Sequence, residues 1–248
     1  MPKISHVLWK RPKYYLHKML KTMLHRLLIP REFYNSLNLE LEVNALLYKL
    51  GVNSDENKRF YGEFIELEET LSKRVFSKEL NYPDQYKMEN GSAFLLYSII
   101  RKMKPEKIVE TGVANGVSSY FILHALLNNG RGSLISIDIS DNVGTILTQE
   151  EKINWELIVL SKPSKAKFKK TMSKIGEIDV FLHDSNHNYH WQSIEYNSAF
   201  MQIRPHGFLM SDDVDSSYAF LDFIVKNKCH AFTLFDKRKI FGIIPVNK

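Results

Sequence analysis

The sequence predicts an α/β fold with a mostly parallel sheet that is covered by helices on both faces. After residue 90, short apolar runs alternate with longer segments of helical periodicity. Strands that alternate with helices are joined by right-handed crossovers, which place the strands parallel in one sheet. The last two apolar runs are separated by only about two residues, so they predict a hairpin and at least one antiparallel strand.

Seven apolar runs are the expected strands. They cover residues 107–112, 133–139, 155–160, 179–184, 207–213, 231–236 and 239–245. Each of the first five is short and ends in polar residues, as expected of a strand that is buried on both faces. Helices are expected over 92–103, 117–129 and 189–203. We therefore predict a Rossmann-like domain with a seven-stranded sheet over residues 85–248.

Residues 1–84 are expected to form a helical N-terminal extension. Between Pro12 and Pro30, Leu and Met recur at steps of three and four residues, which predicts an amphipathic helix over about 12–29. Residues 1–31 contain eight Lys or Arg and no Asp or Glu, so this helix is basic. It could cover its own domain, contact a second subunit or lie on an anionic membrane surface. Further helical stretches are expected at 37–51 and 63–76.

The composition is that of a soluble globular protein. Of the 248 residues, 44% are hydrophobic and 25% are charged. The single cysteine, Cys229, excludes an internal disulfide and a multi-cysteine zinc site, and it favours a cytoplasmic location. The sequence has no apolar run of the roughly 20 residues that cross a bilayer, and its N-terminus lacks the apolar region of a signal peptide.

Carboxylates follow or end several of the expected strands. In an open parallel sheet, ligands bind beyond the carboxyl ends of the strands. The acidic residues expected there are Glu110, Asp138, Asp184, Asp212 and Asp213. Neighbouring like charges destabilise a protein unless cations or hydrogen-bond donors offset them. This edge of the sheet is therefore the predicted functional site.

The segment VETGVANGVSS, residues 109–119, leads from a strand through a glycine-containing turn into a helix. Gly112 and Gly116 would allow a close approach of backbone to a ligand, and the helix N-terminus would direct its N–H groups there. The G-V-A-N-G spacing differs from the dinucleotide pattern G-x-G-x-x-G. Glu110, just ahead of the turn, suits a ligand with an ammonium group. Asp138, at the end of the next strand, could accept hydrogen bonds from two ribose hydroxyls.

Four segments in this order resemble the motifs of class I S-adenosylmethionine-dependent methyltransferases. They are VETGVANGVSS, SIDI (136–139), DVFLHDSNHNYHW (179–191) and RPHGFLMSDDV (204–214). The pattern looks most like the branch that contains metal-dependent sugar O-methyltransferases and cephalosporin hydroxylase-like proteins. This resemblance implies that the cofactor is bound by Glu110, Thr111, Gly112, Asn115, Gly116, Ser118, Ser119, Asp138 and Asp184. The family usually has Gly-Asp-Ser after the third strand, where this chain has Leu160, Ser161 and Lys162.

Asp184, Asp212 and Asp213 are expected at the ends of two neighbouring strands. Three carboxylates suit Mg²⁺ or another divalent cation, which could bind a substrate and acidify its hydroxyl. His187, three residues after Asp184, is the candidate general base, and the resemblance also implies a histidine there. The predicted enzyme is a metal-assisted O-methyltransferase that acts on a small hydroxylated molecule, with a sugar or glycosylated metabolite as the first candidate.

Two other functions remain open. His183, Asp184 and His187 could form the two-histidine, one-carboxylate iron site of an oxygenase. However, His183 should face away from Asp184 on the strand, and we expect it to pack in the core. Alternatively, the altered loop at Leu160 could mark a non-catalytic scaffold. No nucleic-acid partner is expected, because the chain lacks the Asn-Pro-Pro-Tyr and Pro-Cys motifs of base methyltransferases.

Overall fold

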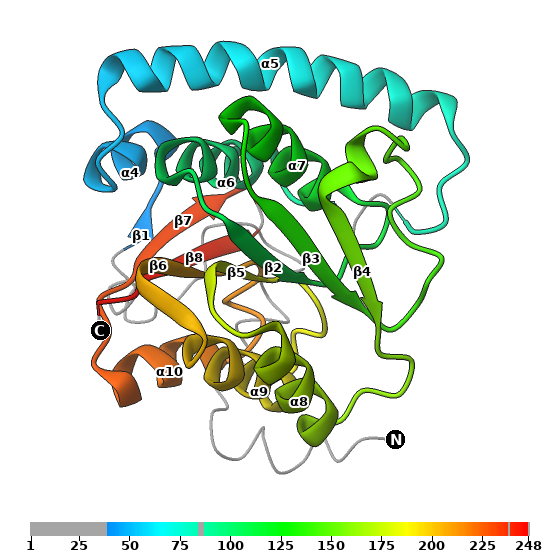
Figure 1. Ribbon diagram of the computed structural model, residues 1–248. Coiled ribbons are helices and arrows are strands. Elements are labelled where there is room, and N and C mark those ends of the chain that lie inside the picture. The colour runs from blue at the N-terminus through cyan, green and yellow to red at the C-terminus, as the bar shows by residue number, and fades with distance from the viewer. Residues whose placement is uncertain (1–38, 84–86, 238, 248) are drawn as a thin grey trace.

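The computed structural model describes residues 39–83, 87–237 and 239–247, and it places an eight-stranded sheet between two layers of helices (Figure 1). The predicted basic helix over about 12–29 lies outside the described residues. The strands are β1 (Leu39–Glu40), β2 (Lys107–Thr111), β3 (Ser133–Asp138), β4 (Trp155–Val159), β5 (Ile178–His183), β6 (Ile203–Ser211), β7 (Phe232–Asp236) and β8 (Lys239–Pro245).

The strand order is β1-β7-β8-β6-β5-β2-β3-β4. Strands β4, β3, β2, β5 and β6 run parallel, whereas β8 is antiparallel to both β6 and β7. All seven predicted strands and the predicted antiparallel hairpin are therefore confirmed. The order reverses at β2, because β3 pairs on one side of it and β5 on the other. Such a reversal is where open parallel sheets bind their ligands.

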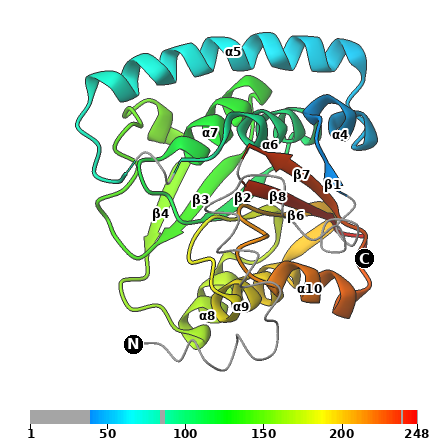
Figure 2. The ribbon, with the colours of Figure 1, turned by 180° about the vertical axis from the view of Figure 1, so that it is seen from behind.

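Helices cover both faces of the sheet (Figures 1 and 2). One layer contains α4 (Val43–Lys49), α5 (Ser54–Ser77), α6 (Asn90–Met103) and α7 (Val117–Asn129). The other contains α8 (Lys165–Ile175), α9 (Tyr189–Phe200) and α10 (Ala219–Asn227), and a short 3-10 helix, η2 (Glu151–Asn154), precedes β4. Within the described residues, no helix combines the length and apolar character needed to cross a bilayer.

The expected helix over 37–51 is corrected by the structure. Leu39–Glu40 form the edge strand β1, which pairs in parallel with β7 through Leu39↔Thr233 and Glu40↔Leu234, and helix α4 starts only at Val43. The leucines at 37, 39 and 41 alternate with polar residues, which is the period of a strand rather than of a helix. Pairing of β1 also covers backbone groups of β7 that an open sheet edge would leave unpaired.

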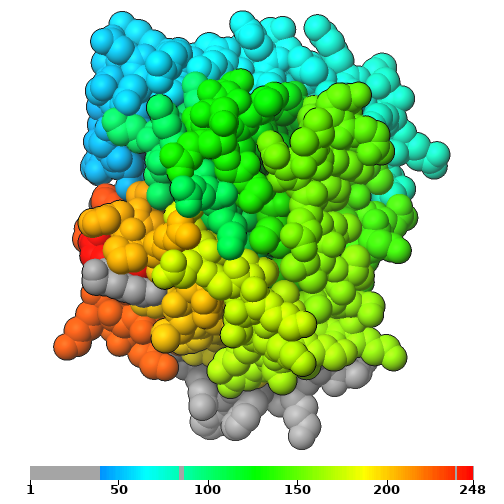
Figure 3. Space-filling view, viewed as in Figure 1, coloured from blue at the N-terminus to red at the C-terminus, as the bar shows by residue number. Residues whose placement is uncertain are grey.

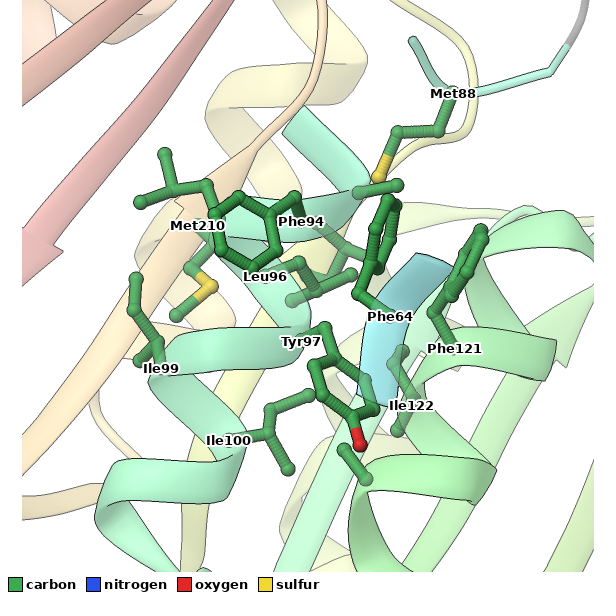
Figure 4. Close-up of a cluster of buried hydrophobic side chains, with 14 of the residues drawn as sticks. Phe64, Met88, Phe94, Leu96, Tyr97, Ile99, Ile100, Phe121, Ile122 and Met210 are labelled. Carbon is green, nitrogen blue, oxygen red and sulfur yellow. The ribbon is translucent and has the colours of Figure 1, made fainter. Parts of the chain in front are cut away.

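Helix α5 is joined to the sheet domain by a shared hydrophobic core. It begins with a capping box, in which Asn53 and Glu56 satisfy each other's backbone N–H groups. Phe64 lies against the rings of Phe94, Tyr97 and Phe121 (Figure 4), and its ring centroid is 4.8 Å from that of Phe121. This part of the N-terminal extension is therefore integral to the main core.

Polar contacts fix both halves of α5, which runs along one side of the molecule in Figure 3. Near its middle, Glu63 accepts two hydrogen bonds from the guanidinium of Arg101 in α6, at 2.7 and 3.0 Å. Nearer its end, Arg74 donates to the backbone oxygen of Ile146 at 2.9 Å and to the carboxylate of Glu151. A bidentate guanidinium–carboxylate pair restricts orientation as well as distance. The helix is thus held in a defined position over α6 and the 146–151 segment.

We predict that Phe64→Ala lowers the free energy of unfolding by about 3–5 kcal/mol, because it removes a buried ring and leaves a cavity. Phe76→Ala is the matched control, since Phe76 lies on the same helix with 95% of its surface exposed. This control should change stability by less than about 0.5 kcal/mol. Urea unfolding followed by circular dichroism measures both, and equal effects would contradict the shared core.

Candidate active site

The register of the sheet aligns the ends of four strands. Thr111 of β2 pairs with Ile137 of β3 and with His183 of β5, and His183 pairs with Ser211 of β6. The residues that follow each strand end therefore lie along one edge of the sheet. This confirms the position predicted for the functional site, although the acidic side chains at this edge have quite different surroundings.

Glu110 lies beneath the glycine loop rather than beside a ligand. Its side chain is fully buried and accepts hydrogen bonds from the hydroxyls of Ser118, Ser119 and Ser136, at 3.1 Å from Ser118 and 2.6 Å from Ser136. Burial raises the pKa of Glu110 to about 7, although the three hydroxyls oppose this shift. Glu110 and Ser119 therefore support the loop and the first turn of α7, and neither lines the cavity described below. Their predicted contact with the cofactor stays a prediction.

Gly112 allows two loops to meet. It has a φ of +80°, and a Cβ built there would lie 2.2 Å from the backbone oxygen of Asp184. Its N–H donates to the oxygen of Ile137 at 3.0 Å, and the N–H of Asp184 donates to the oxygen of Thr111 at 2.9 Å. The close approach that requires glycine is thus to the chain itself, as it is at Gly116, where a Cβ would lie 3.0 Å from Gly144. The approach of a ligand to this backbone, expected from the sequence, stays a prediction, and Gly112 does line the cavity described below.

A second buried carboxylate, Glu195 of α9, was not singled out from the sequence. It accepts hydrogen bonds from Thr111 at 2.6 Å and from Ser185 at 2.8 Å, and it lies 2.5 Å from Nδ1 of His183. The hydroxyl of Thr111 is therefore engaged by α9, and a contact of this residue with the cofactor stays a prediction. His183 is completely buried, as predicted. Its Nδ1 contacts Glu195, and its ring packs against those of His187 and Tyr196.

A cavity of about 1200 Å³ lies over the switch point of the sheet. Its lining includes residues of the glycine loop (112–115), Asp138, the 184–188 loop and the second half of α5. Ligand cavities commonly have volumes of about 300–1,000 Å³, so this one is large enough for two ligands side by side. Of the residues predicted to bind a cofactor, Gly112, Asn115, Ser118, Asp138 and Asp184 line it.

Asp138 and Asn115 order the loops on the β3 side of the cavity. The carboxylate of Asp138 accepts the backbone N–H of Val113 at 2.8 Å and that of Ser140 at 3.1 Å. Asn115 exchanges two hydrogen bonds with the backbone of Tyr82, at 3.1 and 2.8 Å, and so holds the 81–83 segment against the glycine loop. Each carboxylate oxygen can accept more than one hydrogen bond, so Asp138 retains acceptor capacity for a ligand.

Apolar side chains line the cavity near Asp138. Ile139, Leu160, Pro163, Phe168 and Trp191 all contribute to its wall, and the rings of Phe168 and Trp191 meet edge to face at 5.9 Å. Such a wall suits a flat heteroaromatic group. Trp191 packs on Phe168 and also lines the cavity.

The predicted base lies among carboxylates at the β5 and β6 ends. Nε2 of His187 is 3.8 Å from Oδ1 of Asp184 and 3.8 Å from Oδ2 of Asp213. Burial, with a further contribution from Asp212, raises the pKa of Asp184 well above its usual range. Burial and the neighbouring Asp213 raise the pKa of Asp212 in the same direction. The three aspartates therefore converge as predicted, and their negative charge favours a cation or a proton among them.

The residues at this position do not fit a divalent cation as the chain is arranged. Nζ of Lys239 lies 2.7 Å from Oδ2 of Asp212 and 3.4 Å from Oδ2 of Asp213. Mg²⁺ needs oxygen ligands at about 2.0–2.1 Å, and the lysine ammonium lies where such an ion would bridge the two carboxylates. Asp212 is completely buried and does not line the cavity, although its Oδ1 has no hydrogen-bond partner among the described residues. The predicted site of Asp184, Asp212 and Asp213 is therefore corrected to an aspartate cluster paired with lysine.

Comparisons with known proteins identify the domain. Residues 109–214 match the model of a family described as a methyltransferase domain. A comparison with curated proteins gives no match. The matched range contains the glycine loop, Asp138, Asp184 and the Asp212–Asp213 pair. This match covers less than half of the chain, and together with the fold described above it is the pattern that the sequence predicts for a methyltransferase domain.

Solved structures share the fold at low sequence identity. The O-methyltransferase TomG of Streptomyces achromogenes, solved with S-adenosylmethionine, has a TM-score of 0.55 and 16% identity over 84% of this chain and 97% of its own. An O-methyltransferase of Bacillus cereus, solved with S-adenosylhomocysteine, has a TM-score of 0.54 and 13% identity over 73% and 90%. The methyltransferase PaMTH1 of Podospora anserina has a TM-score of 0.53 and 14% identity over 79% and 97%. These likenesses establish a Rossmann-like methyltransferase fold.

We predict a pH-dependent stability that comes from Glu110. Because folding raises the Glu110 pKa from 4.5 to about 7, the stability contributed by its bound proton is full at low pH and is lost as the pH rises through that window. Glu110→Gln cannot titrate. Its free energy of unfolding relative to wild type should therefore increase by about 2–3 kcal/mol as the pH rises from about 5 to about 8.

Denaturant unfolding across this pH range measures the difference. Glu156→Gln is the control, because Glu156 is an exposed carboxylate on β4, and its curve should run parallel to that of wild type. A Glu110→Gln curve that also ran parallel to wild type would show that the buried carboxylate does not titrate in this window.

Proposed function

We propose that this S-adenosylmethionine-dependent methyltransferase transfers a methyl group to a hydroxyl oxygen of a small molecule. The observation that carries the proposal is the position of His187. It lines a cavity with room for two ligands, and its Nε2 lies equally far from two carboxylates. A hydroxyl must lose its proton as it is methylated, and an imidazole in this position can accept that proton.

The residues on the β3 side of the cavity suit the methyl donor. Asp138 has capacity for the two hydroxyls of a ribose, and the wall of Leu160, Phe168 and Trp191 suits an adenine ring. This apolar wall would compensate for the acidic residue that the family usually has after the third strand. S-adenosylmethionine would supply an electrophilic methyl group on its sulfonium sulfur.

The chain's own residues would then act on the acceptor. His187 takes the hydroxyl proton on Nε2, and the carboxylates of Asp184 and Asp213 stabilise the imidazolium that forms. In the same step the hydroxyl oxygen forms a bond to the methyl carbon while the carbon–sulfur bond breaks. The products are a methyl ether and S-adenosylhomocysteine. Because charge is neutralised in this reaction, exclusion of water by the cavity walls favours it.

The far side of the cavity supports a polyhydroxylated acceptor, with a sugar or glycosylated metabolite as the narrower proposal. Helix α5 contributes Leu71 and Val75 to this wall, and Glu68, Asn90 and Lys237 add hydrogen-bonding groups. A sugar presents hydroxyls around an apolar ring face, so a wall of both kinds suits it. Incubation with glycosides and with catechols, followed by measurement of S-adenosylhomocysteine release, tests the class. Turnover of catechols alone would contradict the sugar proposal.

We predict that Asp138→Ala weakens S-adenosylmethionine binding by about 10- to 100-fold, because it removes charge-assisted hydrogen bonds of about 1.5–3 kcal/mol. Isothermal titration calorimetry measures this affinity. Asp141→Ala, an exposed aspartate three residues further along the same loop, should bind normally. Failure of the wild-type protein to bind S-adenosylmethionine at millimolar concentration would instead favour a non-catalytic scaffold.

We predict that His187→Ala lowers kcat by about 10²–10⁴-fold, the usual contribution of a general base. Its affinity for S-adenosylmethionine should stay within about twofold of wild type, since the change lies on the acceptor side. His230→Ala is the control, because His230 is exposed and packs on Phe232 away from the cavity. A normal kcat for His187→Ala would assign the proton to another acceptor.

A further inference from the structure

Lys239 is the first residue of β8, directly after the turn that joins it to β7, and it starts an otherwise apolar strand. Its side chain is only 9% exposed, yet it lines the cavity. A lysine is almost never buried to this extent without a charged partner. Its partners are Asp212, at 2.7 Å from Nζ, and Asp213, at 3.4 Å.

The ammonium group has three N–H donors. One of them donates to Oδ2 of Asp212 at 2.7 Å, and Asp213 lies within ion-pair distance at 3.4 Å. The ammonium can therefore also donate to a group in the cavity that Lys239 lines. His187 lies 3.8 Å from Asp213, so Lys239 and the proposed base share one carboxylate. A donor at this position can hold an oxygen of the acceptor beside the hydroxyl that His187 deprotonates.

We propose that Lys239 is the built-in cation of this site: it takes the place of a divalent ion between Asp212 and Asp213, orients the acceptor, and makes methyl transfer independent of metal. The inference rests on the proposed O-methyl transfer for the orienting role. A metal ion would have to displace an ammonium that forms a buried ion pair with Asp212. Breaking such a pair is strongly unfavourable, because it leaves a buried charge uncompensated.

Manganese binding tests the replacement without any turnover. Titration with Mn²⁺, followed by electron paramagnetic resonance of the free ion, should show no specific site in the wild-type protein. Lys239→Ala removes the ammonium and frees Asp212 and Asp213, so this variant should bind one Mn²⁺ at least tenfold more tightly than wild type. Lys237→Ala is the matched control. Lys237 also lines the cavity but pairs with Glu89 at 3.5 Å and is 65% exposed, so its removal should create no Mn²⁺ site.

Several outcomes would overturn the proposal. Equal Mn²⁺ affinity in wild type and Lys239→Ala, whether tight or weak, would show that the lysine does not occupy a metal position. A single tightly bound Mn²⁺ in the wild-type protein would also overturn the proposal. This measurement needs no variant, so it remains decisive even if Lys239→Ala does not fold. Lys239→Met, which retains the apolar stem, provides a second folded variant for the same titration.

Activity provides an independent readout. Treatment of the wild-type enzyme with a chelator should leave S-adenosylhomocysteine release unchanged, whereas Lys239→Met should raise the acceptor KM by at least tenfold with an unchanged affinity for S-adenosylmethionine. Loss of wild-type activity on chelation, restored by Mg²⁺, would overturn the inference. Failure of the proposed function is distinguishable, because the wild-type protein would then release no S-adenosylhomocysteine with hydroxylated acceptors, whereas the Mn²⁺ comparison would remain intact.

Discussion

The close approach of Gly112 to the backbone of Asp184 is the constraint on which the rest of the site depends. A side chain at position 112 would meet the Asp184 oxygen at 2.2 Å, and the φ of +80° disfavours any residue but glycine. The contact lies at the switch point, where Gly112 also bonds to Ile137 and Asp184 bonds to Thr111. It therefore fixes the loop after β2, where the donor is proposed to bind, against the loop that carries His187. Methyl transfer needs donor and acceptor within bonding reach, and a fixed distance between these two loops is one requirement for that.

The acidic residues at this edge differ in function because different donors satisfy them. Glu110 is enclosed by serine hydroxyls and supports the turn, whereas Asp138 is held by backbone N–H groups and still faces the cavity. Asp212 is paired with Lys239 inside the protein. Hydroxyls are weak partners for a buried charge, which is consistent with the raised pKa of Glu110. At Asp212, the ammonium of Lys239 opposes the rise in pKa that burial and Asp213 cause. Three similar residues at one edge of the sheet are thus held in three ways: by hydroxyls, by backbone N–H groups and by an ammonium.

The sequence predicted seven of the eight strands, the C-terminal hairpin and the edge that carries the candidate site, because periodicity and chain order determine these features. It did not predict which way Glu110 faces, since a strand buried on both faces has no amphipathic period to distinguish them. Lys239 was missed for another reason: it reaches Asp212 across 27 residues of sequence through the antiparallel pairing of β6 and β8. Glu195 was hidden likewise, because its partners at positions 111, 183 and 185 come from two other segments. Charged pairs between distant segments depend on register, which local patterns do not encode.

The acceptor side of the cavity is built from the part of the chain that has the fewest recognisable motifs. The family match starts at residue 109, whereas the cavity wall includes Leu71 and Val75 of α5. The pairs Glu63–Arg101 and Arg74–Glu151 anchor this helix before Leu71 and between Leu71 and Val75, so the wall is held against the sheet domain. Because this wall contains none of the methyltransferase motifs, its residues can differ between proteins without disturbing the proposed donor site. This separation explains why the motifs identify methyl transfer, whereas the choice of acceptor must be sought in α5 and the 80–90 segment.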